Sequence, residues 1–310
     1  MEIFVSAELS NQQAARLREL TGADRLHLHN QYEEAADPDP AFTASEVAFG
    51  NVPASWLTQA PALRWIQLFS VGISDYRDLD WPALSSRITM TNLPGFFSDP
   101  VAESALAGIL ALYRGIDRAV LLQGRAEWQG DALRAQLRSL TGTAVVLFGY
   151  GAINRRLDEL LAPYRCRVTR FRRDWTPRQL DEALAEADIV VGMAPETDAT
   201  IGVFDEARLA LLQKHALFVN FGRGSVVDEN ALAAALNRRD IGGAVIDVTQ
   251  QEPLPRGHPF WTTPSTILTQ HSGGGTIDEY DRIIDVFADN LTRYRDGTLL
   301  LGVVDFERGY

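Results

Sequence analysis

The chain has little of several residue types, and each shortage excludes a kind of structure or chemistry. Cys166 is the only cysteine, so neither an intrachain disulfide nor a multi-cysteine metal site is expected. Lys214 is the only lysine, so a Schiff-base mechanism has a single candidate nucleophile, in a polar segment. No run approaches ~18 consecutive apolar residues, so no segment is expected to span a membrane. The first six residues are too acidic and too poor in apolar length for a signal peptide.

The charge balance and the length narrow the class further. The chain has 41 acidic and 29 basic side chains, a net charge of -12, which argues against nucleic acid and anionic membranes as partners. Hydrophobic residues make up 46% and charged residues 23% of the 310 residues, as is typical of a globular protein of about two domains. We therefore expect a cytoplasmic enzyme or regulator that acts on a small molecule.

The second half of the chain alternates between strands and helices. Buried β-branched runs predict strands, and apolar residues at helical spacing predict most of the helices between them. This alternation indicates βαβ units in a Rossmann-type doubly wound parallel sheet. The strands are predicted at residues 145–148, 168–171, 189–191, 217–220, 244–247 and 266–268, and the first two helices at 154–161 and 179–186.

The first hundred residues show a looser version of the same pattern and predict a second, smaller, flavodoxin-like α/β domain. The hinge between the domains is predicted in the loop from Pro94 to Pro100. We expect residues 1–97 and 280–310 to form the substrate domain and residues 98–279 the dinucleotide-binding domain. Strands are predicted at residues 3–5, 47–50, 65–69 and 89–92, and helices at 11–20, 101–118 and 278–295.

Three polar side chains follow predicted strands near the C-terminal end. Arg223, Glu252 and His271 each come after an apolar run, and ligands of open parallel sheets bind outside the carboxyl ends of the strands. An imidazole exchanges protons near neutral pH, and a carboxylate nearby orients it. Arginine binds a carboxylate through two parallel hydrogen bonds. Together the three residue types predict a catalytic site for an acid substrate, with no metal required.

A glycine loop follows the first strand of the second half. Gly149 allows a tight turn, and Gly151 lets the backbone approach a pyrophosphate, which then lies at the N-terminus of the next helix. The third position of this dinucleotide fingerprint is usually glycine for close packing of helix on strand, but here it is Asn154. The loop predicts a dinucleotide cofactor.

The end of the next strand bears on the choice of cofactor. NAD-binding proteins present an acidic residue there to the ribose hydroxyls. Counting from the glycine loop puts Arg172 at this position, with Arg173 beside it, and two guanidinium groups suit a 2′-phosphate. We expect NADP(H) to be preferred, with NAD(H) possible. If the strand runs two residues longer, Asp174 is the acidic residue instead.

Over nearly its whole length the sequence resembles the D-isomer-specific 2-hydroxyacid dehydrogenase family. One departure is Gln270, because the family's usual residue before the histidine is proline. The C-terminal end is similar to the glyoxylate and hydroxypyruvate reductase branch. The matching segments are 92–95 with 101–103, 187–191 through Pro195 and Thr200, 220–232, 247–255, 271–274 and 302–310.

The resemblance implies a role for each candidate residue. Arg223 binds the substrate carboxylate and polarises the keto oxygen, His271 is the acid–base group, and Glu252 is its partner. The backbone of Val71 and Gly72 also holds the carboxylate. The residues implied to contact the cofactor are Gly149, Gly151, Ala152, Ile153, Arg172, Arg173, Met193, Ala194, Pro195, Thr200, Phe221, Gly222 and, for the nicotinamide carboxamide, Asp247.

The function predicted from these residues is reduction of a small 2-oxo acid, such as glyoxylate or hydroxypyruvate, to a D-2-hydroxy acid by hydride transfer from NAD(P)H. Similar proteins dimerise through the coenzyme domain, so a homodimer is expected. One alternative is a dinucleotide-sensing regulator of the same fold with little turnover. Another is a methyltransferase, although Arg223 and His271 would then have no role.

Overall fold

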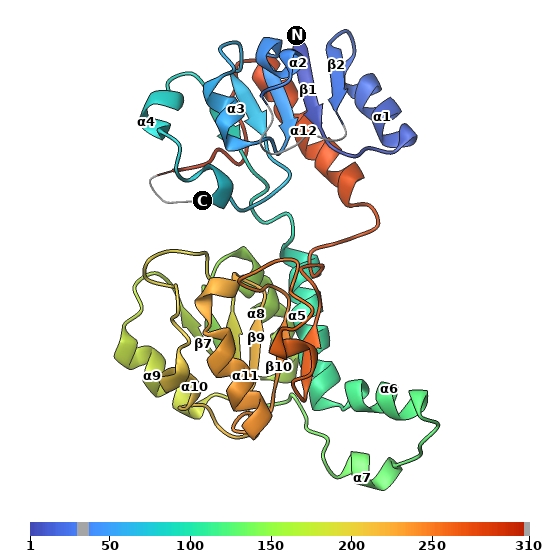
Figure 1. Cartoon of the computed structure of the whole chain (residues 1–310), viewed down its shortest axis with the longest axis vertical. Coiled ribbons are helices and arrows are strands. Elements are labelled where there is room, and N and C mark those ends of the chain that lie inside the picture. Colours follow the sequence, from blue (N-terminus) through green and yellow to red (C-terminus); the bar gives the residue numbers. More distant parts are fainter. Residues whose placement is uncertain (30–36, 307–310) are drawn as a thin grey trace. The chain divides into compact units, whose positions relative to one another are not determined.

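The computed structural model describes residues 1–29 and 37–306, and it divides the chain into two compact units (Figure 1). Unit 1 comprises Met1–Phe96 and Thr276–Tyr310, and unit 2 comprises Phe97–Gly275. Each unit has its own parallel sheet, so the predicted α/β fold class is confirmed.

Unit 1 has a five-stranded sheet in the order β2-β1-β3-β4-β5, and every neighbouring pair is parallel. This is the flavodoxin-like strand order. The strands are β1 (Glu2–Ser6), β2 (Arg25–His29), β3 (Val47–Gly50), β4 (Trp65–Gln67) and β5 (Thr89–Thr91). The helices are α1 (Asn11–Thr21), α2 (Pro40–Ala44), α3 (Ala54–Thr58), α4 (Trp81–Leu84) and α12 (Glu279–Arg295).

The C-terminal helix α12 belongs to unit 1 because its apolar side packs on that sheet. Phe287 stacks on Phe49 and on Trp65, with ring centroids 4.1 and 5.3 Å apart. A separate core cluster of unit 1 contains the aromatic side chains of Phe4, Phe42 and Trp56, which pack among aliphatic side chains. The sheet is therefore covered by helices that come from both ends of the chain.

Unit 2 has a six-stranded parallel sheet in the order β11-β10-β9-β8-β6-β7. The strand order reverses between β6 and β8, and doubly wound sheets bind ligands at the carboxyl ends of the strands around such a reversal. The strands are β6 (Ala144–Phe148), β7 (Arg167–Phe171), β8 (Ile189–Gly192), β9 (Leu217–Asn220), β10 (Gly243–Ile246) and β11 (Thr266–Leu268).

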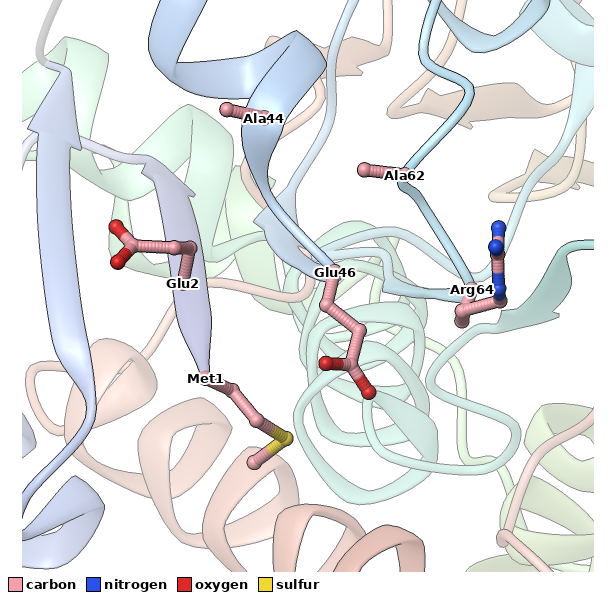
Figure 2. A pocket seen from close by; sticks show the side chains of 6 residues that line it. All are labelled: Met1, Glu2, Ala44, Glu46, Ala62 and Arg64. Carbon is pink, nitrogen blue, oxygen red and sulfur yellow. The ribbon is translucent and has the colours of Figure 1, made fainter.

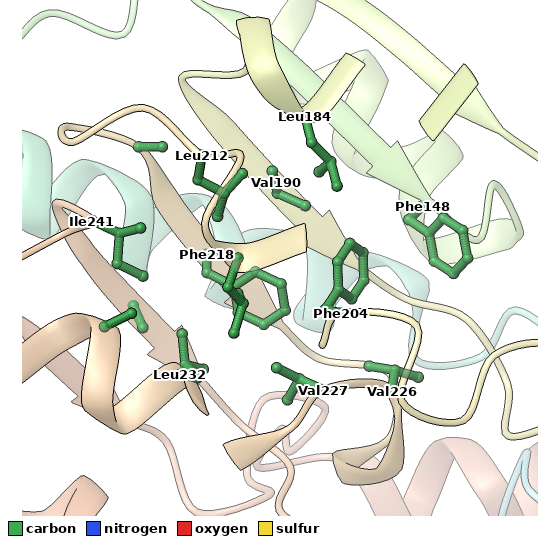
Figure 3. Packing of buried hydrophobic residues seen from close by; sticks show 14 of the residues in the cluster. Phe148, Leu184, Val190, Phe204, Leu212, Phe218, Val226, Val227, Leu232 and Ile241 are labelled. Atoms are coloured by element: carbon green, nitrogen blue, oxygen red, sulfur yellow. The ribbon is translucent and has the colours of Figure 1, made fainter. Parts of the chain in front are cut away.

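The central strands of unit 2, β6, β8, β9 and β10, are buried on both faces, and their successive side chains point to opposite sides. Phe148, Val190 and Phe218 pack with Phe204 and Leu232 on one side, as Figure 3 shows. Their neighbours in the strands form a second cluster with α5 and α8. The helices are α5 (Ser98–Tyr113), α6 (Ile116–Gly124), α7 (Gly130–Arg134), α8 (Ala152–Leu161), α9 (Pro177–Glu186), α10 (Glu206–Leu209) and α11 (Glu229–Arg238).

Among the elements that differ from the sequence-based expectation are the helix after the predicted hinge and strand β2. The helix predicted over residues 101–118 is interrupted after Tyr113, because Gly115 adopts a left-handed conformation (φ +64°) and α6 starts a new helix. Strand β2, which no pattern predicted, alternates Arg, Leu and His at the sheet edge and is only half-buried. An edge strand needs less apolar material than a central one, so its sequence signal is weak.

Candidate active site

Arg223 lies in the loop after β9, and a buried amide shapes that loop. The side chain of Asn220 accepts a hydrogen bond from the Gly222 N–H (3.1 Å) and donates one to the Arg223 carbonyl (2.9 Å). The half-buried guanidinium of Arg223 donates to the Gly222 carbonyl (2.8 Å) and forms no ion pair within the described residues. Its charge is therefore available to an anion.

Glu252 and His271 form a hydrogen-bonded pair. His271 Nδ1 lies 2.6 Å from Glu252 Oε2, and Glu252 Oε1 accepts the Thr249 N–H at 2.9 Å. The histidine side chain is 58% exposed and the glutamate 36%, so the pair is open to solvent. A carboxylate on Nδ1 orients the ring and leaves Nε2 as the nitrogen that exchanges a proton. The predicted partnership has the geometry that general acid–base chemistry needs.

Asp247 organises the loop that carries His271. Its buried Oδ1 accepts hydrogen bonds from the Thr269 hydroxyl (2.5 Å), the Ser272 N–H (3.1 Å) and the Gly273 N–H (3.1 Å). Its backbone carbonyl accepts the His271 N–H at 2.7 Å. The residue expected to contact the nicotinamide therefore also holds the imidazole loop in place.

Two consecutive residues of this loop have left-handed backbones. Gln270 has φ +56° and His271 has φ +54°. Non-glycine residues adopt this region rarely, at a cost of about 1–2 kcal/mol each. Proline is locked near φ −65° and cannot adopt it. The absence of the family's usual proline thus matches the local backbone.

The loops of Arg223, Glu252 and His271 converge through close backbone contacts. A Cβ at Gly224 would lie 2.1 Å from the carbonyl carbon of Thr249, so only glycine lets the Arg223 loop approach the Glu252 loop. A Cβ at Gly273 would lie 2.6 Å from the Phe221 ring. Three adjacent strands, β9, β10 and β11, therefore deliver the cation, the carboxylate and the imidazole to one edge of the sheet.

The glycine loop has the features of a pyrophosphate site. Gly149 adopts φ +82°, and a Cβ there would lie 2.5 Å from the Ala194 nitrogen. A Cβ at Gly151 would meet nothing within 4 Å, so the backbone is open to a ligand. Among the described residues, no side chain caps the N-terminus of α8. Free N–H groups and the helix dipole suit a phosphate there, so the residues fit a dinucleotide.

Asn154, at the position of the third glycine, is held by hydrogen bonds to the glycine loop and the end of β6. Its side chain is fully buried and donates to the carbonyls of Phe148 (3.1 Å) and Gly149 (3.2 Å). These bonds tie the first turn of α8 to the end of β6. A pair of hydrogen bonds thus does here what close packing on glycine does elsewhere.

The segment after β7 presents the two candidate arginines. The strand ends at Phe171, so Arg172 follows it directly, and Asp174 lies in a turn beyond. Arg172, Arg173 and Asp174 are all exposed. The Arg172 guanidinium carbon lies 5.2 Å from the centroid of the Tyr150 ring in the glycine loop.

The remaining predicted cofactor residues line the same edge of the unit 2 sheet. Met193 and Ala194 are buried directly after β8, and Ala152 and Ile153 begin α8. Thr200 Oγ1 donates to the Pro195 carbonyl at 2.6 Å, which closes the turn between them. In unit 1, Val71 and Gly72 follow β4, and within the described residues their N–H groups donate no hydrogen bond.

Glu229 and His258 are part of the site's support, and the sequence reading missed them. Buried Glu229 accepts the Gln250 N–H at 2.8 Å and lies 3.3 Å from His258 Nε2. Burial raises the pKa of Glu229. The contact holds the turn that leads to Glu252. An acidic residue in the first turn of a helix is common, so nothing in the sequence marked this one as buried.

Unit 1 also has a hollow of about 480 Å³ lined by Met1, Glu2, Ala44, Glu46, Ala62 and Arg64 (Figure 2). Met1, Glu46 and Arg64 each precede a strand, so the hollow lies at the amino ends of the strands. Ligands of doubly wound sheets bind at the opposite, carboxyl ends. The described residues contain no cluster of His, Cys, Asp and Glu that could hold a metal ion.

The doubly wound sheet, the uncapped helix behind a glycine loop and the Glu252–His271 pair are the features expected of a dinucleotide-dependent oxidoreductase. The model of the D-isomer specific 2-hydroxyacid dehydrogenase NAD binding domain matches residues 106–273. The chain therefore belongs to the D-isomer specific 2-hydroxyacid dehydrogenase family, which confirms the resemblance seen in the sequence. No helix in the described part of the chain is long and apolar enough to cross a membrane.

Individual relatives agree with this assignment. Glyoxylate reductase from Thermofilum pendens is 31% identical over 271 residues, which cover 83% of this chain and 79% of that protein. Mitochondrial formate dehydrogenase from Solanum tuberosum is 32% identical over 258 residues, 79% of this chain and 67% of that protein. The crystal structure of the TT0316 protein from Thermus thermophilus has a TM-score of 0.81 and 26% identity, with 98% of this chain and 100% of that chain covered.

Proposed function

We propose that this protein reduces a small 2-oxo acid, of the glyoxylate or hydroxypyruvate kind, to a D-2-hydroxy acid with a nicotinamide cofactor. The observation that carries the proposal is the 2.6 Å contact of His271 with Glu252, on loops that pack against the Arg223 loop. A proton donor and an unpaired guanidinium are what a keto acid needs, one for its oxygen and one for its carboxylate.

In the proposed mechanism each side chain acts on a stated atom. Arg223 grips the substrate carboxylate with its guanidinium fork, and Asn220 fixes the loop that aims it. A nicotinamide cofactor, when bound at the glycine loop, would supply the hydride. As negative charge grows on the keto oxygen, His271 donates the proton of Nε2 to it, and Glu252 stabilises the imidazolium beforehand. Asp247 keeps the His271 loop in position, and its second carboxylate oxygen would accept a hydrogen bond from the amide group of the nicotinamide carboxamide.

Val71 and Gly72 are proposed to bind the substrate carboxylate through their backbone. Their N–H groups, which have no acceptor within the described residues, support this role. We propose residues 1–97 and 280–310 as the substrate domain and residues 98–279 as the dinucleotide-binding domain. The cytoplasm remains the location predicted from the sequence.

The cofactor is proposed to be NADP(H) in preference to NAD(H). Arg172 follows β7 directly and forms no ion pair among the described residues, whereas an acidic residue there would repel a 2′-phosphate. Charge-assisted hydrogen bonds to a phosphate support the preference. We expect replacement of Arg172 and Arg173 by alanine to weaken NADPH binding about ten-fold or more and leave NADH binding nearly unchanged in fluorescence titrations.

A homodimer formed through unit 2 is also proposed. Helix α6 exposes Ile116, Val120 and Leu121 to 53%, 59% and 61%, and Trp128 just beyond it is 96% exposed. Apolar side chains gathered on one short segment favour burial against a second copy. Light scattering on the full chain, and on a variant with Val120 and Leu121 changed to serine, tests the assembly.

The function is tested with a panel of substrates against both cofactors. Glyoxylate, hydroxypyruvate and pyruvate are reduced with NADPH or NADH, and formate is offered with NADP⁺ or NAD⁺ because one relative is a formate dehydrogenase. The hydroxypyruvate product should be D-glycerate; glycolate is achiral and cannot report handedness. Cofactor binding without turnover of any compound would favour the sensing regulator, and turnover of formate alone would contradict the proposal.

A further inference from the structure

Tyr150 stands between the two glycines of the cofactor loop and is firmly anchored. Its hydroxyl donates to Asp158 Oδ2 at 2.6 Å. Asp158, whose side chain is only 13% exposed, also receives Arg170 Nε at 2.6 Å and Nη2 at 3.0 Å. Burial acts to raise the pKa of Asp158, but the hydrogen bonds from Arg170 and Tyr150 outweigh it and lower that pKa. The carboxylate therefore stays charged and keeps the tyrosine in place.

The ring of Tyr150 contacts two arginines whose charges differ in availability. The guanidinium carbons of Arg170 and Arg172 lie 5.7 and 5.2 Å from its centroid. Arg170 is neutralised by Asp158, whereas Arg172 has no ion pair among residues 1–29 and 37–306. Both distances are within the range of a cation–π contact. Of the two arginines on the Tyr150 ring, only Arg172, at the end of β7, therefore keeps a positive charge that no carboxylate of the described residues neutralises.

Backbone hydrogen bonds join the glycine loop, which carries Tyr150, to the end of β7, which carries Arg172. The N–H groups of Gly149 and Tyr150 both donate to the Phe171 carbonyl, at 3.2 and 2.9 Å. These two hydrogen bonds tie the cofactor loop to the end of β7. An exposed arginine samples many rotamers and loses that freedom when it binds a phosphate. A fixed aromatic surface removes part of this loss in advance.

We propose that Tyr150 is a specificity-determining residue, whose ring, held by Asp158, orients the Arg172 guanidinium toward the 2′-phosphate of NADPH. The inference rests on the proposed preference for NADP(H) and deepens it. Tyr150 acts through Arg172 and is therefore a positioning residue for the cofactor. Its effect appears only with ligands that have a 2′-phosphate, which separates it from a general role in folding the loop.

The test uses calorimetric titration of the full chain with adenosine 2′,5′-bisphosphate and with 5′-AMP, which differ in the 2′-phosphate. Tyr150→Leu removes the ring, and we expect two- to five-fold weaker binding of the bisphosphate, as an exposed cation–π contact implies, with AMP binding unchanged. Tyr150→Phe keeps the ring without its anchor and should give a smaller loss. Tyr113→Phe, which alters a buried tyrosine far from the loop in sequence, is the matched control.

A double-mutant cycle completes the test. Tyr150→Leu added to Arg172→Ala should weaken bisphosphate binding no further than Arg172→Ala alone. Equal weakening of both ligands by Tyr150→Leu, or additive losses in the cycle, would overturn the role of Tyr150 and leave the cofactor preference standing. If the unaltered chain binds both ligands equally, the preference itself fails and the inference fails with it.

Discussion

Removing the carboxylate of Asp247 should loosen the loop that presents His271 without touching the imidazole. Oδ1 accepts three hydrogen bonds, from the Thr269 hydroxyl and from the N–H groups of Ser272 and Gly273. A hydrogen bond to a charged group contributes about 1.5–3 kcal/mol. Ser272 is exposed and regains water when Asp247 is lost, whereas Gly273 is buried. The net local loss in Asp247→Ala should therefore be about 2–4 kcal/mol.

Amide hydrogen exchange measures this loss where it occurs, because protection reports local opening. A tenfold change corresponds to about 1.4 kcal/mol, so the Ser272 and Gly273 amides should exchange about 30- to 1,000-fold faster in Asp247→Ala. Asp247→Asn keeps an acceptor oxygen without its charge, so about half of the free energy with which these hydrogen bonds stabilise the loop should be retained. Turnover should follow the same order as the protection of these amides from exchange: highest in the parent, lower in Asp247→Asn and lowest in Asp247→Ala.

The control is Asp205→Ala, which removes the N-terminal cap of α10 elsewhere in unit 2. It should leave the exchange of Ser272 and Gly273 unchanged. If Asp247→Ala alters exchange at these two amides by less than three-fold, Asp247 does not hold the loop and the reasoning is wrong.

Three further outcomes are expected. His271→Ala should lower the reduction rate at least ~100-fold while NADPH still binds, and a rate within a few-fold of the parent would remove the acid–base role. Arg223→Lys keeps the charge but loses the planar fork, so the Michaelis constant for the oxo acid should rise and turnover should fall. For Asp188, burial acts to raise the pKa, but hydrogen bonds from the Ala144 N–H and His215 outweigh it and lower the pKa below 3.8. Because the pKa of Asp188 is lower in the folded than in the unfolded chain, its ionised carboxylate stabilises the fold at pH values above the unfolded-state pKa. Asp188→Asn should therefore unfold at a lower urea concentration than the parent at neutral pH. The difference should shrink as the pH falls below 3.8.

Much of the fold was predictable because the central strands of unit 2, from β6 to β10 in the sheet, are buried on both faces. Such strands appear as short apolar runs, and polar residues that follow them lie at the ligand-binding edge of a parallel sheet. Arg223, Glu252 and His271 were selected in this way. The structure places them on three converging loops, and Glu252 is hydrogen-bonded to His271. Their catalytic roles remain predictions.

What the sequence could not predict depends on contacts between distant segments or on single dihedral angles. Glu229 and His258 are far apart along the chain, and their meeting requires the turn after β10 to fold back on α11. Tyr150 occupies a variable position of the glycine loop, so its link to Asp158 and Arg172 had no pattern to predict it. Gly115 resembled any helical glycine, yet its positive φ ends the helix.

The paired left-handed residues Gln270 and His271 constrain how this protein can change over evolutionary time. Proline cannot adopt the φ of +56° found at Gln270, so the residue usual in the family cannot be introduced here by one substitution. The backbone at residue 270 would first have to change from a positive to a negative φ while Asp247 kept its hydrogen bonds to the loop. The order of substitutions therefore matters, and exchange of this loop between relatives has to move the whole segment from Thr269 to Gly273 at once.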